Sequence, residues 1–416
     1  MKRHLALATL VLGVSLTRDV ESQSPSAIVG VGAGIDFSCV LRRGGDVLCW
    51  GRNDVGQLGR GTSDARAHPA PVRVALRDRA IALSVGRDHA CALIADSSAF
   101  CWGDDRMGES GAETGADRCD DFGVTVSCRR RPVRVGGDNR FRSIAAGFHE
   151  SCGISPARRV LCWGAAFVAT QPPDSASLAR CGAPDIPQWC RRGPTVVPLM
   201  TRPQKGQPYL ASLDSLALGA FLSCAVVRAG IGYTFCWGPV NSGELPRWTG
   251  SGAYVEGLKT ASIGDEHACG IDYNSALFCW GTKWIVPGDS LYKRKPVRGV
   301  FRPVNADRRF TAVSVGAMHS CAIEAVTQRL FCWGANQYGQ LGLGTSHPLQ
   351  GPPLRSAYPR PEPVGGALRF SMVAAGLEHT CALTVDGNLY CWGRALRGVL
   401  GARDGSVPIP TRMPVQ

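Results

Sequence analysis

The chain has 416 residues, of which 44% are hydrophobic and 19% are charged, a composition typical of a folded globular protein rather than a disordered one. Its formal net charge of +13 comes mainly from arginine, and the basic residues are scattered rather than gathered in one stripe. This scatter argues against a nucleic acid partner, and the lack of a second long apolar segment argues against a membrane-spanning helix.

The beginning of the chain has the features of a secretion signal. Lys2 and Arg3 are followed by an apolar run at 5–16, which is too short to span a bilayer. The sequence therefore predicts a signal peptide over residues 1–26, cleaved between Ser15 and Ala27. A secreted, periplasmic or cell-envelope location follows from this prediction.

A unit of two cysteines that ends in Cys-Trp-Gly recurs seven times after residue 27. In the last unit, Ala375–Gly393, two short β-prone runs flank Asp386-Gly387, which is a strong hairpin signal. The two cysteines lie symmetrically about this turn, so they should face each other at a distance that suits a disulfide. The seven expected hairpin disulfides are Cys39–Cys49, Cys91–Cys101, Cys152–Cys162, Cys224–Cys236, Cys269–Cys279, Cys321–Cys332 and Cys381–Cys391.

Four further cysteines lie in the two longest insertions between units, at 104–131 and 165–213. They form two pairs with equal spacing, and we expect the disulfides Cys119–Cys128 and Cys181–Cys190. All eighteen cysteines are then paired in nine disulfides, which indicates an oxidising compartment.

The first and sixth units share a longer pattern, N-x-x-G-Q-L-G-x-G-T, at Asn53–Thr62 and Asn336–Thr345, whereas the second unit retains only Gly108 of this loop. With the seven hairpins, this pattern resembles the regulator of chromosome condensation repeat family, in a secreted, disulfide-rich branch of bacterial type. The resemblance implies an all-β, seven-bladed β-propeller with four-stranded blades, formed as one domain by residues 27–416.

The ends of the propeller suggest how the ring closes. The first unit has no Pro-Val strand before it, while the chain finishes with Pro414-Val415. We therefore expect the terminal strand to complete the first blade as a clasp between the two ends, which would cover exposed sheet edges.

Several residue types that often perform chemistry have simpler interpretations here. Four histidines lie two residues before a cysteine, but other units have phenylalanine, glutamate or leucine in that position, which no common metal site would tolerate. We expect His89, His267, His319 and His379 to hydrogen-bond the backbone of a neighbouring blade, and the seven Cys-Trp-Gly tryptophans to pack between blades. The carboxylates of 104–121 lack the spacing of a calcium loop and should form a solvated acidic loop. No metal or other cofactor is predicted.

The sequence contains no catalytic motif, so we expect a monomeric, non-enzymatic scaffold that binds a protein, or a surface polysaccharide, through loops on one face. Disulfide-pinned insertions on a rigid frame are a common way to display a binding surface. The candidate contact residues are Asp120, Asp121, Arg129, Arg130, Trp189, Arg191 and Arg192, with Trp248 and Trp284 as further exposed tryptophans. Two alternatives remain: a guanine-nucleotide exchange factor-like regulator of a small GTPase, which the resemblance implies, and a hydrolase or lyase with a site built by the insertions.

Overall fold

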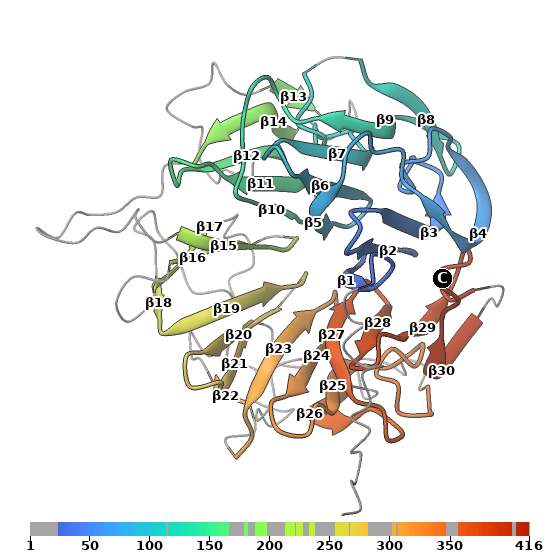
Figure 1. Ribbon diagram of the computed structural model, residues 1–416, viewed down its shortest axis with the longest axis vertical. Helices are drawn as coiled ribbons and strands as arrows, with labels where there is room; N and C mark the ends of the chain where they lie inside the picture. The colour runs from blue at the N-terminus through green and yellow to red at the C-terminus, as the bar shows by residue number, and fades with distance from the viewer. Residues whose placement is uncertain are drawn as a thin grey trace, which may run out of the picture.

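Seven antiparallel sheets stand around a common axis in the computed structural model (Figure 1). The structure describes residues 24–113, 115–165, 179–181, 188–197, 213–220, 222–227, 233–237, 254–265, 267–281, 302–304, 307–346, 357–401 and 405–415. Of the signal peptide expected over residues 1–26, residues 1–23 lie outside the described residues. The all-β, seven-bladed propeller predicted from the sequence is confirmed. Nowhere in these described ranges is there a helix long and apolar enough to cross a membrane.

Each blade is one consecutive segment of the chain, with its first strand next to the axis. Blade 1 comprises β1 (Ile28–Ala33), β2 (Phe37–Arg42), β3 (Val47–Asn53) and β4 (Asp64–Arg73); blade 2 comprises β5 (Ala80–Val85), β6 (His89–Ile94), β7 (Ala99–Asp104), β8 (Asp117–Asp121) and β9 (Val124–Arg134); blade 3 comprises β10 (Ser143–Ala146), β11 (Glu150–Ile154), β12 (Val160–Ala165), β13 (Ala179–Cys181) and β14 (Gln188–Val196).

The remaining four blades have four strands each. They are β15 (Leu213–Leu218), β16 (Ser223–Val227), β17 (Tyr233–Trp237) and β18 (Tyr254–Glu256); β19 (Leu258–Ile263), β20 (His267–Asp272), β21 (Leu277–Gly281) and β22 (Arg302–Pro303); β23 (Phe310–Val315), β24 (His319–Glu324), β25 (Leu330–Ala335) and β26 (Ala357–Pro363); and β27 (Phe370–Ala375), β28 (His379–Thr384), β29 (Leu389–Ala395) and β30 (Gly405–Arg412).

The Cys-Trp pair of each Cys-Trp-Gly motif belongs to the third strand of its blade. Its cysteine lies directly opposite the first cysteine of the unit, as Cys39 lies opposite Cys49, and the nine disulfides join the pairs expected from the sequence. The glycine is required because Gly51 has a φ of 103°, and a Cβ atom there would lie 2.3 Å from the carbonyl oxygen of Asp36. The motif therefore combines a cross-strand staple with a backbone position that favours glycine.

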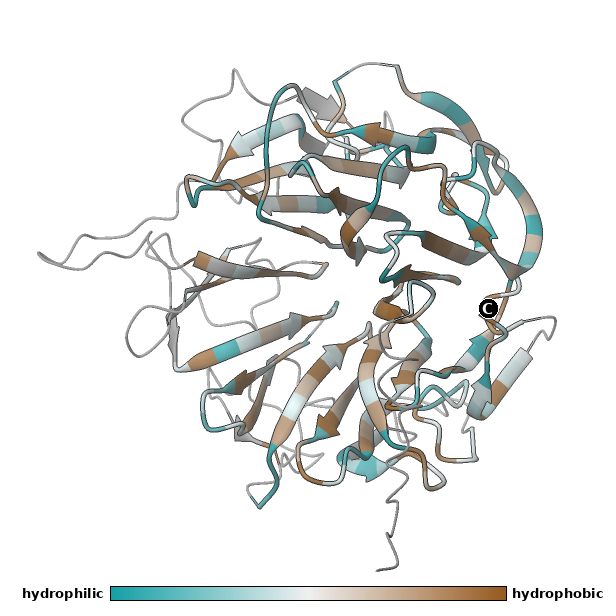
Figure 2. Ribbon diagram, in the orientation of Figure 1, coloured by the Kyte–Doolittle hydropathy of each residue, from teal (hydrophilic) through white to brown (hydrophobic). Residues whose placement is uncertain are grey.

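The tryptophans of the motif fill the space between blades, as predicted. Trp50, Trp102, Trp163, Trp333 and Trp392 have no exposed surface, and the strands near the axis are mostly apolar (Figure 2). Four indole Nε1–H groups donate to a carbonyl oxygen in the loop of the preceding blade: Trp50 to Val399, Trp102 to Gln57, Trp163 to Glu109 and Trp392 to Gln340, at 2.8–2.9 Å. Each of these tryptophans thus anchors its own blade to the blade before it.

The expected strand clasp is wrong. The last strand, β30, pairs with β29 in blade 7, and β1 pairs with β2 at the inner edge of blade 1. Each Pro-Val strand completes the blade whose Cys-Trp-Gly motif comes before it in the sequence. In blade 1, Val72 of β4 lies opposite Cys49 of β3, so this blade already has its outer strand and needs none from the end of the chain. Side-chain packing and backbone hydrogen bonds between blades 7 and 1 close the ring instead. Trp50 shares an apolar cluster with Leu389 and Val407 of blade 7, and the N–H of Leu377 donates to the carbonyl of Gly34 at 3.2 Å.

Candidate functional site

The two faces of the ring differ in what they carry. On one face lie the turns between first and second strands and the loops after the third strands, since Phe37 at the start of β2 is opposite Gly51 near the end of β3. Both insertions leave from this face, which we call the insertion face. The opposite hairpin face carries the turns between second and third strands and the connections between blades, because Ile28 at the start of β1 is opposite Arg42 at the end of β2.

Each insertion adds a pair of strands to its blade. Strands β8 and β9 meet at Phe122 and Gly123 and carry Cys119–Cys128, while β13 pairs with β14 and carries Cys181–Cys190. Each disulfide packs against a loop of the preceding blade: Cys119–Cys128 against Val55 of blade 1, and Cys181–Cys190 against Met107 of blade 2. The insertions are therefore docked onto neighbouring blades.

An arginine of blade 1 ties the β8–β9 hairpin to the insertion face. The side chain of Arg52 is only 8% exposed and donates to three carboxylates, Asp54 at 2.6 Å, Asp88 at 2.8 Å and Asp121 at 2.6 Å. The second oxygen of Asp121 accepts from Arg106 of blade 2 at 2.7 Å. One continuous set of ion pairs thus joins two blades and the hairpin.

Blade 2 has the glycine loop of blades 1 and 6, with acids in place of its two amides. The equivalent side-chain bonds to backbone N–H groups are Asn53–Leu58 and Gln57–Val55 in blade 1, Asn336–Leu341 and Gln340–Tyr338 in blade 6, and Asp105–Ser110 and Glu109–Met107 in blade 2, at 2.8–3.1 Å. The expectation that the second unit retains only Gly108 is therefore wrong. Substitution of Asp for Asn and Glu for Gln was the sequence signal that could have identified the loop.

The acid at position 105 has a specific partner in the insertion. Arg129 donates from Nε to Asp105 at 2.8 Å, and both side chains are 4% exposed. Arg129 also donates to the hydroxyl of Ser110 at 3.2 Å and to the carbonyl of Ala112 at 3.0 Å. Burial raises the pKa of Asp105, and the Arg129 guanidinium opposes this shift. This closed ion pair holds β9 against the glycine loop.

The acidic start of the insertion is buried, which contradicts the expected solvated loop. Burial raises the pKa of Asp104 to about 7 and that of Glu109 to about 8, and it lowers the pKa of His149. Oε1 of Glu109 lies 2.8 Å from Nδ1 of His149, and the raised pKa of Glu109 with the lowered pKa of His149 favours a pair without net charge. Potential ligand atoms of these three residues lie within 4.8 Å of one another, but Arg106 lies 2.8 Å from Asp104 and disfavours a cation there.

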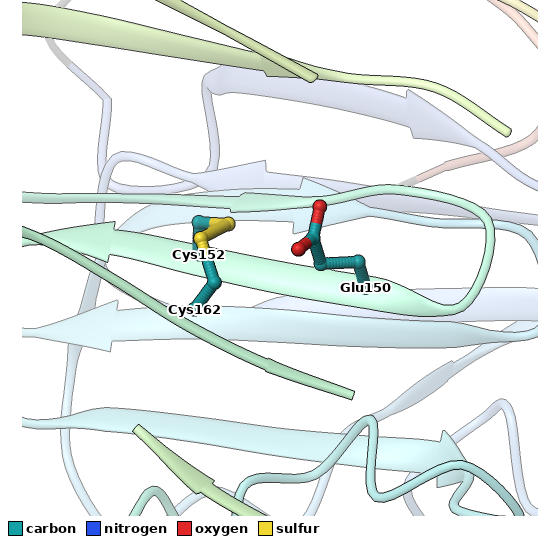
Figure 3. Close-up of side chains that lie close together, drawn as sticks. All are labelled: Glu150, Cys152 and Cys162. Carbon is teal, nitrogen blue, oxygen red and sulfur yellow. A yellow bond between two sulfur atoms is a disulfide. The ribbon is translucent and has the colours of Figure 1, made fainter. Parts of the chain in front are cut away.

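A second group of potential metal ligands lies in blade 3, where Glu150 is next to Cys152 and Cys162 (Figure 3). The two sulfur atoms are bonded to each other and offer no thiolate. Glu150 accepts from the hydroxyl of Ser223 at 2.7 Å, and burial raises its pKa to about 7. This arrangement is a contact between blades 3 and 4.

The histidine position before each first cysteine makes the same kind of contact. Its partner is a hydroxyl of the next blade rather than the backbone group expected: His89 bonds Ser151, His267 bonds Ser320, His319 bonds Thr380 and His379 bonds Ser38, at 2.6–2.8 Å. Where the position is apolar, the partner is alanine: Phe37 shares a cluster with Ala90, and Leu222 shares one with Ala268. The two positions are therefore matched at each of these interfaces.

This matching predicts a coupled pair of substitutions. Ser320→Ala should leave Nε2 of the buried His267 without an acceptor or donor and cost about 1–3 kcal/mol. The double variant H267L/S320A copies the adjacent Leu222–Ala268 pair and should recover most of that loss. Urea unfolding with intact disulfides measures the stability of His267→Leu, of Ser320→Ala and of the double variant. A loss in the double variant equal to the sum of the two single losses would contradict the matching.

The structure separates the candidate contact residues into two groups. Asp120 and Arg192 are exposed, and Arg130 is 40% exposed beside Asp117. Arg129 and Asp121 are instead held in the ion pairs described above, and Arg191 is mostly buried near Glu150 at 3.7 Å. Each of these three side chains has an intramolecular partner.

Trp189 lies in β14 opposite Arg180, whereas Trp248 and Trp284 lie outside the described residues. Sequence reasoning missed Phe122, which is 73% exposed, and Val124, which is 62% exposed. Both lie at the tip of the β8–β9 hairpin. The signal was the dipeptide Phe122-Gly123 halfway between two paired cysteines.

Comparisons with known proteins agree with this architecture. Profiles described as the regulator of chromosome condensation (RCC1) repeat match residues 44–93 and 328–383, and a second profile of that description matches 28–57, 310–340 and 373–398. The ultraviolet-B receptor UVR8 of Arabidopsis thaliana is 24% identical over 93% of this chain and 81% of its own length. The regulator of chromosome condensation of Drosophila melanogaster is 22% identical over 93% of this chain and 59% of its own length.

Solved structures show the same fold. Prp20p of Saccharomyces cerevisiae superimposes with a TM-score of 0.69 at 18% identity, covering 94% of this chain and 89% of its own. Human WBSCR16 superimposes with a TM-score of 0.64 at 19% identity, covering 85% and 86% of the two chains.

Proposed function

The chain belongs to the regulator of chromosome condensation repeat family, and from this premise we propose that it is a secreted, non-enzymatic scaffold that binds a protein through the insertion face. The nine disulfides fit an oxidising environment outside the cytoplasm. The observation that carries the proposal is the tip of the β8–β9 hairpin, where the chain presents an aromatic side chain on a rigid support.

Phe122 has a backbone conformation that an aromatic residue rarely adopts. Its φ is 53° and that of Gly123 is 86°, so the two residues form a two-residue turn of the kind in which asparagine and glycine are favoured. A bulky residue in this region costs of the order of 1 kcal/mol or more, and such strain often marks a ligand-binding position. Phe122 is nevertheless 73% exposed, which supports a role as an anchor for a partner.

Side chains of blades 1 and 7 contact the tip of this hairpin. The Arg52 guanidinium lies 5.1 Å from the Phe122 ring centroid and that of Arg397 lies 5.6 Å from it, so charges of blades 1 and 7 flank the ring. The Cys119–Cys128 disulfide and the ion pairs of Asp121 hold the hairpin against the insertion face. An anchor held in this way loses little conformational entropy when it binds.

Removal of the anchor should abolish partner binding without unfolding the protein. In F122N/V124T the turn gains its favoured residue and loses the two exposed contacts of the ring with Arg52 and Arg397, so the stability should stay within about 1 kcal/mol of the original. We expect the immobilised original protein to retain a specific extracellular or envelope protein that F122N/V124T does not retain, measured by quantitative mass spectrometry of the eluted proteins.

The matched control is Val326→Ser, which changes an 87% exposed valine at a hairpin-face turn of blade 6. It should retain the same protein as the original. Retention of one protein by all three baits would contradict the proposal. Retention of a small GTPase in place of an extracellular protein would instead support the exchange-factor alternative.

A further inference from the structure

The basic residues are scattered along the sequence, but the fold gathers ten arginines on the hairpin face of blades 1–3. Its turns and connections hold ten arginines and four aspartates: Arg42, Arg43, Arg73, Arg77, Arg79, Arg134, Arg140, Arg142, Arg158 and Arg159, with Asp46, Asp78, Asp96 and Asp138. At the equivalent described turns and connections of blades 5–7, five basic residues are accompanied by four acidic ones: Arg308, Arg309, Arg329, Arg369 and Arg412, with Asp272, Asp307, Glu324 and Asp386. The excess positive charge is thus localised on one side of this face.

The arginines of this patch are mostly without intramolecular partners. Two ion pairs occur within the patch, Arg73–Asp46 at 2.5 Å and Arg134–Asp138 at 3.7 Å. The exposed side chains of Arg43, Arg77 and Arg79 pair with no carboxylate among the residues described. This contrasts with the insertion face, where the guanidinium of Arg52 is fully engaged. The hairpin-face guanidinium groups therefore have donors available to an external acceptor.

A hollow of about 160 Å³ lies between the β2–β3 turn and the β4–β5 connection, at the blade 1 end of the patch. Three arginines, Arg73, Arg77 and Arg79, and two aspartates, Asp46 and Asp78, line it, so its charged lining carries a net positive charge. Its volume is sufficient for a carboxylate or sulfate group, and the planar guanidinium can donate two parallel hydrogen bonds to such a group.

We propose that this patch binds an anionic polysaccharide, with one carboxylate or sulfate group in the hollow and the chain lying across Arg43, Arg77 and Arg79. The nine disulfides fit an oxidising compartment such as a cell surface, where this face would be accessible to a polymer outside the cell. Proteins that bind single-stranded nucleic acids combine positive charge with exposed aromatic side chains on which the bases stack. Among the described residues of this patch, none of the exposed large apolar side chains is aromatic, which argues against a single-stranded nucleic acid as the partner. The patch lies on the face opposite Phe122, so both surfaces can be occupied at once.

Dextran sulfate and uncharged dextran of equal length are the probes that test this proposal. We expect dextran sulfate to bind and uncharged dextran not to bind, with an affinity that falls steeply between about 50 and 200 mM NaCl because bound counterions are released. R77E/R79E should weaken dextran sulfate binding by about tenfold or more and reduce the slope of its salt dependence.

The control R66E/R118E makes the same change in net charge at two exposed arginines outside the patch. It should bind dextran sulfate almost as tightly as the original protein. An equal loss in both double variants, or no binding by the original protein at low salt, would overturn the proposal. A preference for duplex DNA over dextran sulfate would also overturn it, because the partner would then belong to a different class.

Discussion

Replacing Arg129 by methionine is expected to lower the free energy of unfolding by about 3–5 kcal/mol, the largest loss that we predict for a single side chain. The substitution leaves the carboxylate of Asp105 buried at 4% exposure without its cation. It also removes the hydrogen bond to the carbonyl of Ala112. Urea unfolding under non-reducing conditions measures the loss.

Two variants distinguish the loss of the ion pair from a general effect of changing the insertion. D105N/R129M places at position 105 the asparagine that blades 1 and 6 have at the equivalent position, so it should recover most of the stability lost in R129M. Arg130→Met removes a guanidinium that is 40% exposed, and should cost less than about 1 kcal/mol. R129M within 1 kcal/mol of the original protein would contradict the assigned role of the pair.

Glu109→Gln is expected to change how stability depends on pH. Burial raises the folded-state pKa of Glu109 from 4.5 to about 8, so the folded protein retains a proton that the unfolded chain releases. The stabilisation due to that proton is complete below pH 4.5 and is lost as the pH rises to about 8, by about 1.4 kcal/mol per pH unit. The glutamine variant lacks this loss and should be progressively more stable than the original protein from pH 5 to pH 8.

Because the Glu109 carboxylate raises the pKa of Asp104, the difference between the two stability curves reports this carboxyl together with its coupling to Asp104. The groups facing Glu109 remain in both proteins. They are His149, Asp104, Asp105 and Arg106. The buried histidines have pKa values of about 3 to 4 and contribute the opposite slope below pH 6.5, equally in both proteins. Gln340→Glu in blade 6 should introduce the same kind of slope. If the free energies of unfolding of the original protein and E109Q change in parallel from pH 5 to pH 8, the raised pKa at Glu109 is contradicted.

The fold could be predicted from the sequence because each blade repeats its own local signals. The central hairpin of blade 7 contains a turn dipeptide, a disulfide and a Cys-Trp-Gly glycine within Ala375–Gly393, and all of these act over short distances. The closure of the ring was predicted wrongly, because a repeating sequence does not say to which neighbour a strand pairs. Only the register of Val72 opposite Cys49 assigns that strand to its own blade.

The candidate site could be predicted only in part. The two insertions and their disulfide pairs were visible as cysteine spacing, but the partners of Arg129 and Asp121 belong to other segments of the chain. A charge in an insertion looks the same in sequence whether it faces solvent or a buried carboxylate. Phe122 was missed because its exposure depends on a two-residue turn that normally favours asparagine.

Photo-crosslinking in the native host tests the central claim most directly. A benzophenone amino acid replaces Phe122 at the tip of the β8–β9 hairpin in one variant, and Val326 on the hairpin face in the other. If the insertion face binds a protein, ultraviolet irradiation should join the variant at position 122 to one discrete extracellular or envelope protein, and should not join the variant at position 326 to it. The same crosslinked products from both positions, or none from position 122, would contradict the account.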